Sequence, residues 1–309
     1  MKWADKPYHS LDYEMKLRYG EKVYRLTLNG NMTCPNRDGT LGRRGCIFCS
    51  AGGSGDFAAP AALSITEQME QQKALLLQKR PVHRFIAYFQ AYTNTYAPVE
   101  YLERIFTEAI RFPDVVALSI ATRPDCLPDD VLRLLDRLNQ KVPVWVELGL
   151  QTVHDETAMK IGRGHDFAAF CDGFRRLRAA GGDIQICIHL IDGLPGESLE
   201  MMLDSARSVA ALEPDMVKLH LLHVLRGTPL ARQYLSGDYT PMSMEAYTDT
   251  AVRQLELLPP DTVIARVTGD APAELLLAPD WCRKKTAVSN EIDRLMYGRR
   301  TYQGALFTK

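Results

Sequence analysis

Long apolar runs and an excess of one charge are both missing from this sequence of 309 residues. No segment approaches the roughly 18 consecutive apolar residues that a membrane helix needs, and the first residues contain no apolar signal region. A cytoplasmic protein that does not enter a membrane is therefore expected. The 37 Lys and Arg residues nearly balance the 38 Asp and Glu residues, for a net charge of −1. This balance argues against a uniformly basic nucleic-acid binder and leaves local patches for such a role.

The sequence has seven cysteines, and their placement is uneven. Three of the seven cysteines, Cys34, Cys46 and Cys49, stand as Cys-x11-Cys-x2-Cys in a loop rich in Gly, Pro, Asn, Asp and Arg. An odd number with one tight cluster fits a reducing cytosol and a metal site better than a set of disulfides. Three thiolates from one loop suit an iron–sulfur cluster with one iron left free. A zinc ion is the alternative, but zinc takes four ligands and no second Cys-x2-Cys pair exists.

What the sequence does contain is a regular alternation of strand-like and helix-like segments. Strands are predicted at 23–28, 83–90, 115–121, 144–151, 184–191, 216–223 and 262–267. Helices are predicted at 65–79, with Thr66 as N-cap, and at 99–112, 128–139, 154–161, 167–180, 198–212 and 243–257. Short connections between apolar strands and helices indicate a parallel sheet covered by helices. With right-handed crossovers, we expect an α/β fold with a partial (β/α)6-type parallel barrel.

No low-complexity linker or repeat divides the chain, so one domain with two additions is predicted. Residues 1–22 are expected to form an N-terminal arm or short helix, residues 23–270 the core, and residues 271–309 a basic C-terminal extension.

Polar residues gather where the predicted strands end. The carboxyl ends of parallel strands meet at one face, which is where α/β proteins bind ligands. Buried strands that end in Glu, Gln, Asp and His therefore predict an active site there. These strand ends hold Gln90 to Asn94, Thr122 to Asp125, Glu147, Gln151, Asp192 to Glu197, His220 and His223.

Together these motifs resemble the radical S-adenosylmethionine (SAM) enzymes, over roughly residues 20–270. Those enzymes usually carry Cys-x3-Cys-x2-Cys with an aromatic residue before the last cysteine, as Phe48 stands here. The longer first spacer, x11, resembles the spacer found in the small bacterial subgroup that is related to the catalytic subunit of Elongator. Further similar stretches are Glu147 to Thr152, Arg163 to His165, Gly193 to Glu197 and Lys218 to Pro229.

The resemblance implies cofactors and their ligands. Cys34, Cys46 and Cys49 are expected to hold a 4Fe-4S cluster, and SAM to bind its fourth iron. An electron donor such as flavodoxin or ferredoxin would reduce the cluster, which cleaves SAM to a 5'-deoxyadenosyl radical. The protein then supplies orientation and excludes water.

Roles for the SAM-binding residues follow from the same resemblance. Gln90 to Asn94 are expected near the methionine amino group, and Gly193 and Gly196 against adenine. Gln151 and Arg163 are expected to contact SAM, with the Arg163 fork on the methionine carboxylate. Glu147 is expected to accept hydrogen bonds from the ribose, since a buried carboxylate needs donors. The alternatives are a polar loop, a solvated arginine, an ordinary turn, and for Glu147 an internal salt bridge.

Candidates for a catalytic role are weaker. His220 and His223 end the sixth predicted strand, where alternation of side chains places them on opposite faces. One of them is expected to point into the barrel, with a structural histidine as the alternative. Cys126 follows the third strand and is a further candidate, whereas Cys171 and Cys187 lie in apolar segments and are expected in the core.

The predicted substrate is RNA. Residues 281–309 contain seven Lys and Arg against two acidic residues, together with aromatics. Such a segment is an electrostatic footprint for nucleic acid, although a solvated charged tail is the alternative. A tRNA anticodon loop suits it, because unpaired bases can be turned out into a pocket. The RNA-binding candidates are Arg283, Lys284, Lys285, Arg299 and Arg300, with Arg37, Arg43 and Arg44 in the cysteine loop.

The subgroup resemblance makes the substrate more specific. It implies maturation of the wobble uridine of tRNA, in which a 5-carboxymethylaminomethyl group becomes 5-aminomethyl. Two other functions stay open at this point: a radical SAM enzyme acting on a small metabolite, and a non-catalytic zinc or interaction protein.

Overall fold

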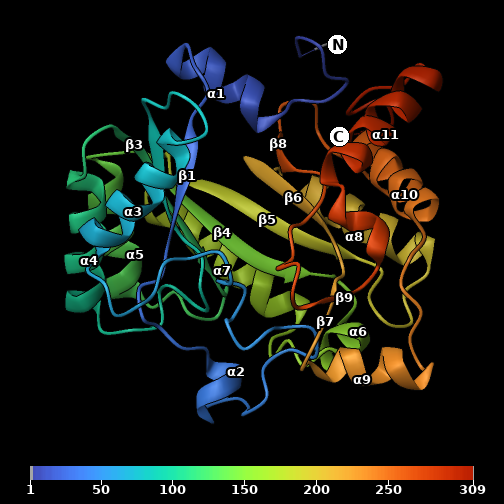
Figure 1. The fold of residues 1–309 in the computed structure, drawn as a ribbon, viewed down its shortest axis with the longest axis horizontal. Coiled ribbons are helices and arrows are strands. Elements are labelled where there is room, and N and C mark those ends of the chain that lie inside the picture. The colour runs from blue at the N-terminus through green and yellow to red at the C-terminus, as the bar shows by residue number, and fades with distance from the viewer. Residues whose placement is uncertain (1–2, 309) are drawn as a thin grey trace.

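The computed structural model describes residues 3–308 as one curled sheet with helices on its outer face (Figure 1). Seven strands pair in parallel in the order β1-β2-β3-β4-β5-β6-β8. The strands are β1 (Tyr24–Leu28), β2 (Phe85–Phe89), β3 (Val115–Thr122), β4 (Val144–Gln151), β5 (Gln185–Asp192), β6 (Met216–Leu221) and β8 (Val263–Arg266). Strands β1 and β8 do not pair with each other, so the barrel is open between them. The predicted parallel half-barrel is confirmed, with a seventh strand after the six βα units.

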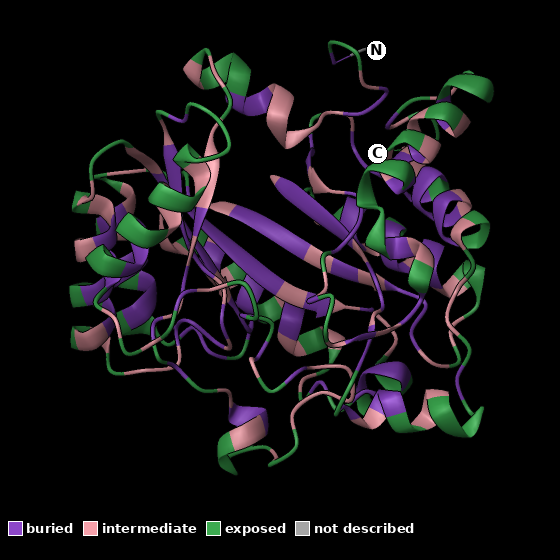
Figure 2. Cartoon of the chain, in the orientation of Figure 1, coloured by how far each residue is buried: buried purple, intermediate pink, exposed green. Residues whose placement is uncertain are grey.

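Helices cover the outer face of the curled sheet, with α3, α4 and α5 at the β1 end and α8 and α10 at the β8 end (Figure 1). Their apolar stripes pack on the strands, most of whose residues are buried (Figure 2). They are α3 (Ile65–Leu77), α4 (Val99–Arg111), α5 (Asp129–Asn139), α6 (Asp155–Lys160), α7 (Phe167–Ala180), α8 (Leu199–Ala211) and α10 (Met244–Leu257). Thr66 as N-cap was wrong: Ser64 caps α3 in a reciprocal pair with Glu67, and Thr66 bonds to Glu108 instead.

The barrel interior changes from apolar to charged along the strands. At the amino end, one apolar layer is closed by Met15 of α1 (Leu11–Tyr19), and consists of Ile86, Ala117, Trp145, Cys187, Met216 and Val263. Side chains two residues further along a strand point to the same face. The next layer is accordingly formed by Tyr88, Ser119, Glu147, His189 and Lys218, which hydrogen-bond to one another.

The N-terminal arm and the C-terminal extension pack together on the β8 edge. The Ile264 amide donates to the His9 carbonyl at 2.7 Å, which covers part of that edge. The buried Gln303 accepts from the His9 amide at 2.8 Å and donates to the carbonyls of Pro259 and Thr262. The division at residues 22 and 270 stays a prediction, but these segments belong to the same folded body as the core.

Several elements were not predicted from the sequence. They are α2 (Pro35–Asp38), β7 (Val224–Leu225), α9 (Pro229–Ser236), β9 (Leu276–Ala278), the 3-10 helix η1 (Asp280–Arg283) and α11 (Lys285–Gly298). Strands β7 and β9 form a small antiparallel ribbon. Helix α11 packs against α10 and buries Val288, Ile292 and Met296. No helix within residues 3–308 combines the length and apolar character needed to cross a membrane.

Candidate active site

A cavity of about 290 Å³ lies at the carboxyl ends of the strands. Six of the seven strands contribute to its wall, together with the cysteine loop. We call the part around Cys34, Cys46, Cys49, Arg123 and Arg163 the cysteine end. The part formed by His189, Lys218, His220, His223, Arg266 and Asp270 is the histidine end. The predicted convergence of polar strand ends is therefore found in the structure.

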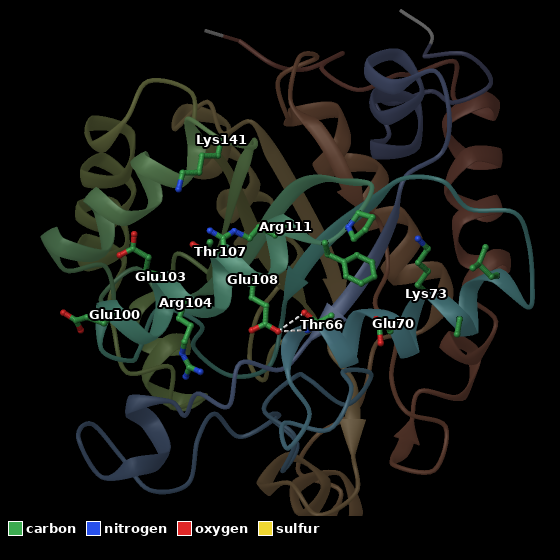
Figure 3. A pocket seen from close by; sticks show the side chains of 14 residues that line it. Thr66, Glu70, Lys73, Glu100, Glu103, Arg104, Thr107, Glu108, Arg111 and Lys141 are labelled. Carbon is green, nitrogen blue, oxygen red and sulfur yellow. Dashed lines mark hydrogen bonds between the residues drawn. The ribbon is translucent and has the colours of Figure 1, made fainter.

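A larger groove of about 1150 Å³ lies elsewhere, on the outer surface between α3 and α4 (Figure 3). Its wall mixes charges of both signs, such as Glu100, Glu103, Arg104 and Arg111, and contains none of the predicted site residues. The smaller cavity is therefore the candidate site.

The cysteine loop is held against the β4–α7 connection by its Asn36 side chain. Asn36 Nδ2 donates to the carbonyls of Gly162 and Arg163 at 3.0 and 2.8 Å. Gly164, with φ of +81°, lets the two segments meet, because a Cβ there would stand 2.3 Å from Asn36 Oδ1. Backbone bonds from Ile47 to Ile161 and from Leu230 to Ile47 fix the second half of the loop.

The three cysteines of this loop fit a cluster. All line the cysteine end as free thiols, and Asn36 Nδ2 lies 3.7 Å from the Cys46 sulfur. Within residues 3–308, no three Cys, His, Asp or Glu side chains converge as the ligands of one metal ion do. A cluster instead spreads its thiolates over separate irons. Burial, together with the nearby Cys49, raises the pKa of Cys46 to about 12. Binding to iron would overcome this preference for the neutral thiol, because a coordinating thiol is deprotonated.

Arg37 belongs to the loop itself. Its Nη2 donates to the carbonyls of Cys49 and Ser50 at 3.1 and 2.6 Å, and its guanidinium lies 5.6 Å from the Tyr92 ring centroid. The structure therefore uses Arg37 to shape the loop, and does not offer it to RNA as predicted.

Arg163 is buried rather than solvated, with 1% of its surface exposed. Its guanidinium donates to the carbonyls of Leu150, Thr152 and His165, and burial lowers its pKa to about 10. Only Nη2 lacks a hydrogen-bond partner within the described chain, at 3.7 Å from Asp155. This nitrogen is what remains for the methionine carboxylate, so that role stays a prediction.

Of the other predicted SAM contacts, Gln90 and Gln151 line the cavity and Asn94 does not. Gln151 has a φ of +65° where the β4–β5 register shifts, so the strand ends with a local kink. Asn94 lies behind the wall, where its Nδ2 donates to the carbonyls of Phe89 and Ala121. Its neighbours Tyr92 and Thr93 line the cavity in its place.

The turn after β5 is also outside the wall of the cavity. Tyr239 Oη donates to the Gly193 carbonyl at 2.8 Å, and Met242 covers the same glycine. Neither Gly193 nor Gly196 lines the cavity, whereas Ile191 does. Cys126 is likewise buried outside it, and burial raises its pKa to about 12. The structure does not support a reactive thiol at Cys126, because the thiolate is the nucleophile.

Glu147 is the centre of the charged layer. Its carboxylate accepts hydrogen bonds from Tyr88 and Ser119 at 2.9 Å each, lies 2.9 Å from His189 Nε2, and forms an ion pair with Lys218. Burial alone would raise the pKa of Glu147, but Lys218 and His189 hold it well below the usual value. The internal salt bridge is therefore present. The ribose contact stays a prediction, and the ribose hydroxyls would have to share the Glu147 oxygens with Lys218, Tyr88 and Ser119.

His220 and His223 both line the histidine end, which corrects the prediction that they face opposite ways. Strand β6 ends at Leu221, so alternation no longer governs His223. Both rings lie against Gly269, whose added Cβ would stand 2.9 Å from His223 and 3.5 Å from His220. Burial lowers the pKa of His223 to about 4 and that of His220 well below its usual value.

The basic candidates are divided between two ends of α11, which is about 20 Å long. Arg283 donates to the carbonyls of Ala273 and Leu276, and Lys285 pairs with Asp270 at 2.8 Å. These positions lie on the cavity side. Arg299, which pairs with Asp249, and Arg300 lie at the far end, where Lys6 of the arm pairs with Asp293. They cannot form one patch with the exposed Arg43, Arg44 and Lys284.

Sequence reasoning placed Arg123 at the predicted site without giving it a role, and it missed His189, Lys218 and Arg266 as site residues. A lysine inside the apolar strand Met216–Leu221 was the available signal, since a buried charge is retained only with a partner. Arg123 pairs with Asp125 and donates to the Arg163 carbonyl at 2.7 Å, which no local pattern reveals.

A half-barrel with three cysteines at its mouth defines a class of cofactor-dependent enzymes, and comparison with known proteins identifies which. Residues 39–209 match the Radical SAM superfamily, and residues 214–297 match the Radical_SAM C-terminal domain. The chain belongs to the radical SAM superfamily. It is a radical SAM enzyme, whose cofactors are a 4Fe-4S cluster and SAM.

Relatives cover most of the chain. The uncharacterized protein YtqA of Bacillus subtilis is 45% identical over 99% of this chain and 94% of its own length. Protein YhcC of Escherichia coli is 40% identical over 92% and 90%. Human Elongator complex protein 3 is 30% identical over 59% of this chain but only 32% of its own length. The structure of Elp3 from Methanocaldococcus infernus, 20% identical, shares the fold with a TM-score of 0.70, over 91% of this chain and 64% of that one.

Proposed function

We propose that this radical SAM enzyme matures the wobble uridine of tRNA, converting 5-carboxymethylaminomethyl-uridine to 5-aminomethyl-uridine in the cytoplasm. The observation that carries the proposal is the similarity to Elongator complex protein 3 over 59% of the chain. The long first spacer of the cysteine loop resembles the same subgroup.

Exposed cations on the cysteine loop and beside Asp270, both of which contribute to the wall of the cavity, support an RNA substrate. Arg43 and Arg44 are exposed on the cysteine loop, and Lys284 is exposed beside the Lys285–Asp270 pair on the other side. Exposed cations of this kind bind phosphates without reading sequence. Arg299 and Arg300 have no part in the proposal.

The cavity suits a base turned out of a single-stranded loop. Phe57 lines it with 49% of its surface exposed, so its ring is available for stacking. Stacking on aromatic side chains is the usual way of holding an unpaired base. The neutral rings of His220 and His223 at the histidine end can then contact the substituent at position 5 of the uridine.

The proposed conversion is an oxidation followed by hydrolysis. When bound, the cluster and SAM supply a carbon-centred radical that takes one hydrogen atom from the methylene between the amine and the carboxylate. The substrate radical then gives its electron to an oxidised carrier such as flavodoxin or ferredoxin, and the amine nitrogen loses its proton to water, which leaves an imine. Water adds to the imine, the C–N bond breaks, and the products are the 5-aminomethyl group and glyoxylate.

Anaerobic incubation of the reconstituted protein with SAM, a reductant and bulk tRNA from a strain lacking the gene tests this proposal. Nucleoside analysis should show that 5-carboxymethylaminomethyl-uridine falls while 5-aminomethyl-uridine rises by the same amount. The Cys46→Ser protein should show neither change.

Cleavage of SAM with no change in any nucleoside would contradict the proposal. A gel-shift assay then decides between the alternatives, because absence of tRNA binding even at low salt favours a small metabolite as substrate.

A further inference from the structure

The histidine end of the cavity holds one cationic side chain, Arg266, that makes a single long ion pair and no side-chain hydrogen bond within the described chain. Four arginines of the described chain line the cavity. Arg37, Arg123 and Arg163 donate to backbone carbonyls of the loops around them. Arg266 donates no hydrogen bond within residues 3–308, and its closest carboxylate oxygen is that of Asp270, at 3.8 Å. The other oxygen of Asp270 is taken by Lys285 at 2.8 Å.

The position of Arg266 comes from an irregularity in the sheet. The β6–β8 register shifts between Val217 and Lys218, which places Arg266 beside Lys218. Lys218 in turn pairs with His189 of β5. Residues in register on parallel strands point to the same face, so these three side chains form a row across the histidine end.

Two buried nitrogens beside this row also lack partners. The Nε2 atoms of His220 and His223 are buried and make no hydrogen bond within the described chain. Buried polar atoms in native proteins are nearly always bonded, so each such exception calls for a ligand or water. With pKa values well below neutrality, both rings are uncharged at pH 7 and can each donate one N–H.

The charges around the row favour an anion. The Lys218 charge is already balanced by Glu147, and that of Lys285 by Asp270. Arg266 is left in excess, and Arg25, 3.9 Å from Glu147, adds to the same sign. A guanidinium fork matches a carboxylate bidentately, and this geometry makes arginine the usual carboxylate ligand.

We propose that Arg266, with His220 and His223, forms a subsite that binds a substrate carboxylate, with the guanidinium on the anion and the histidines on its oxygens. The identity of the group rests on the proposed function, in which the substrate carries a carboxymethyl unit on its amine. Strand β8 is the sheet edge opposite β1, from which the cysteine loop departs. In the proposed arrangement the carboxylate lies at the histidine end, and the adjacent methylene faces the cysteine end.

The first test measures turnover of an anticodon stem-loop that bears 5-carboxymethylaminomethyl-uridine. Arg266→Gln should lower kcat/KM about 10- to 100-fold, mainly through KM, as loss of a charge-assisted contact does. Arg266→Lys keeps the charge without the fork and should lose less. The matched control is Arg133→Gln on the outer helix α5, an exposed arginine that should behave as wild type. Cluster content and uncoupled SAM cleavage should be equal in all four proteins.

The second test does not depend on tRNA. N-methylglycine has the same amine and carboxylate as the proposed substrate group, and at concentrations up to about 100 mM it should raise the melting temperature of the holoenzyme. Its amide should not, because it lacks the anion. Arg266→Gln should abolish the response and Arg133→Gln should retain it.

The two arms separate the two proposals. If no nucleoside is converted but N-methylglycine stabilises the wild type and not Arg266→Gln, the tRNA function is wrong and the subsite stands. If conversion occurs and Arg266→Gln matches the wild type in KM and in the N-methylglycine response, the subsite is wrong and the function stands. Absence of both conversion and any N-methylglycine response overturns the subsite as well.

Discussion

Replacing Glu147 by Gln should destabilise the protein more than any surface change, because it leaves Lys218 buried without a counter-ion. Both side chains are 1% exposed. Removing one partner of a buried ion pair typically costs about 3–5 kcal/mol. A buried lysine can avoid the charge by losing its proton. Removing the proton of a lysine with the ordinary pKa of 10.5 costs about 5 kcal/mol at pH 7, at about 1.4 kcal/mol per pKa unit. This cost is the upper bound on the destabilisation by Glu147→Gln.

The cost of Glu147→Gln should also depend on pH in a definite direction. Burial lowers the pKa of Lys218 to about 8 in the folded protein, so between 8 and 10.5 the folded state binds fewer protons than the unfolded state. Stability from this group therefore rises with pH across that window. Without Glu147 the folded pKa of Lys218 falls further, and the window extends below 8. The difference in free energy of unfolding between the Glu147→Gln variant and the wild type should narrow by about 1 kcal/mol from pH 7 to pH 9.

Urea unfolding of the reduced proteins, followed by circular dichroism, measures these differences. Lys218→Met should cost less than Glu147→Gln, because Glu147 keeps its hydrogen bonds from Tyr88 and Ser119 and has Arg25 3.9 Å away. The double variant should lie within about 2 kcal/mol of wild type, since a buried pair is often replaceable as a unit. The control is Asp129→Asn, which breaks an exposed pair with Arg176 and should cost less than about 1 kcal/mol. Strict additivity of the two single variants, or a gap that widens with pH, would refute the reasoning.

Three further predictions concern the loop and the core. Cys46→Ser should abolish iron binding and visible absorption after reconstitution, whereas Cys171→Ser on α7 should leave both unchanged; equal iron content in the two would contradict the assignment. Gly164→Ala should lower the free energy of unfolding by about 1–3 kcal/mol and speed the loss of iron, because the added Cβ would stand 2.3 Å from Asn36 Oδ1 and φ is +81°. If the variant retained iron as long as the wild type, Asn36 would have moved without disturbing the cysteine loop. Burial raises the pKa of Asp192 to about 7, so the folded state holds a proton that the unfolded state releases above 3.8, and stability falls as pH rises through that window. Asp192→Asn should remove this decline and gain up to about 4 kcal/mol at pH 7 in urea unfolding, and identical pH slopes would exclude the mechanism.

The elements of the fold could be predicted from the sequence because one pattern governs each of them. Burial on both faces makes strands apolar, and packing on one side gives helices a period of 3.6 residues. The predicted helix at 167–180 matches α7 (Phe167–Ala180) for this reason. Helix α11 was missed because residues 281–309 hold seven Lys and Arg, and this charge drew attention away from the apolar spacing of Val288, Ile292 and Met296.

Individual site roles were harder to predict because partners come from distant strands. Glu147 was recognised as a buried carboxylate that needs donors, but its donors lie 28 to 71 residues away in sequence. Arg266 enters the cavity only because of a register shift, and His223 only because β6 ends early. Local periodicity carries no signal for either event. The cysteines were the exception, since their spacing alone keeps three thiolates in one loop.

The arrangement separates cofactor chemistry from substrate recognition along the chain. The superfamily match at residues 39–209 includes Cys46, Cys49 and Arg163, which form the cysteine end. The proposed subsite residues at the histidine end lie wholly within the C-terminal domain match at residues 214–297. Because the Glu147–Lys218 pair joins the two segments inside the barrel, each end of the cavity is positioned by the other.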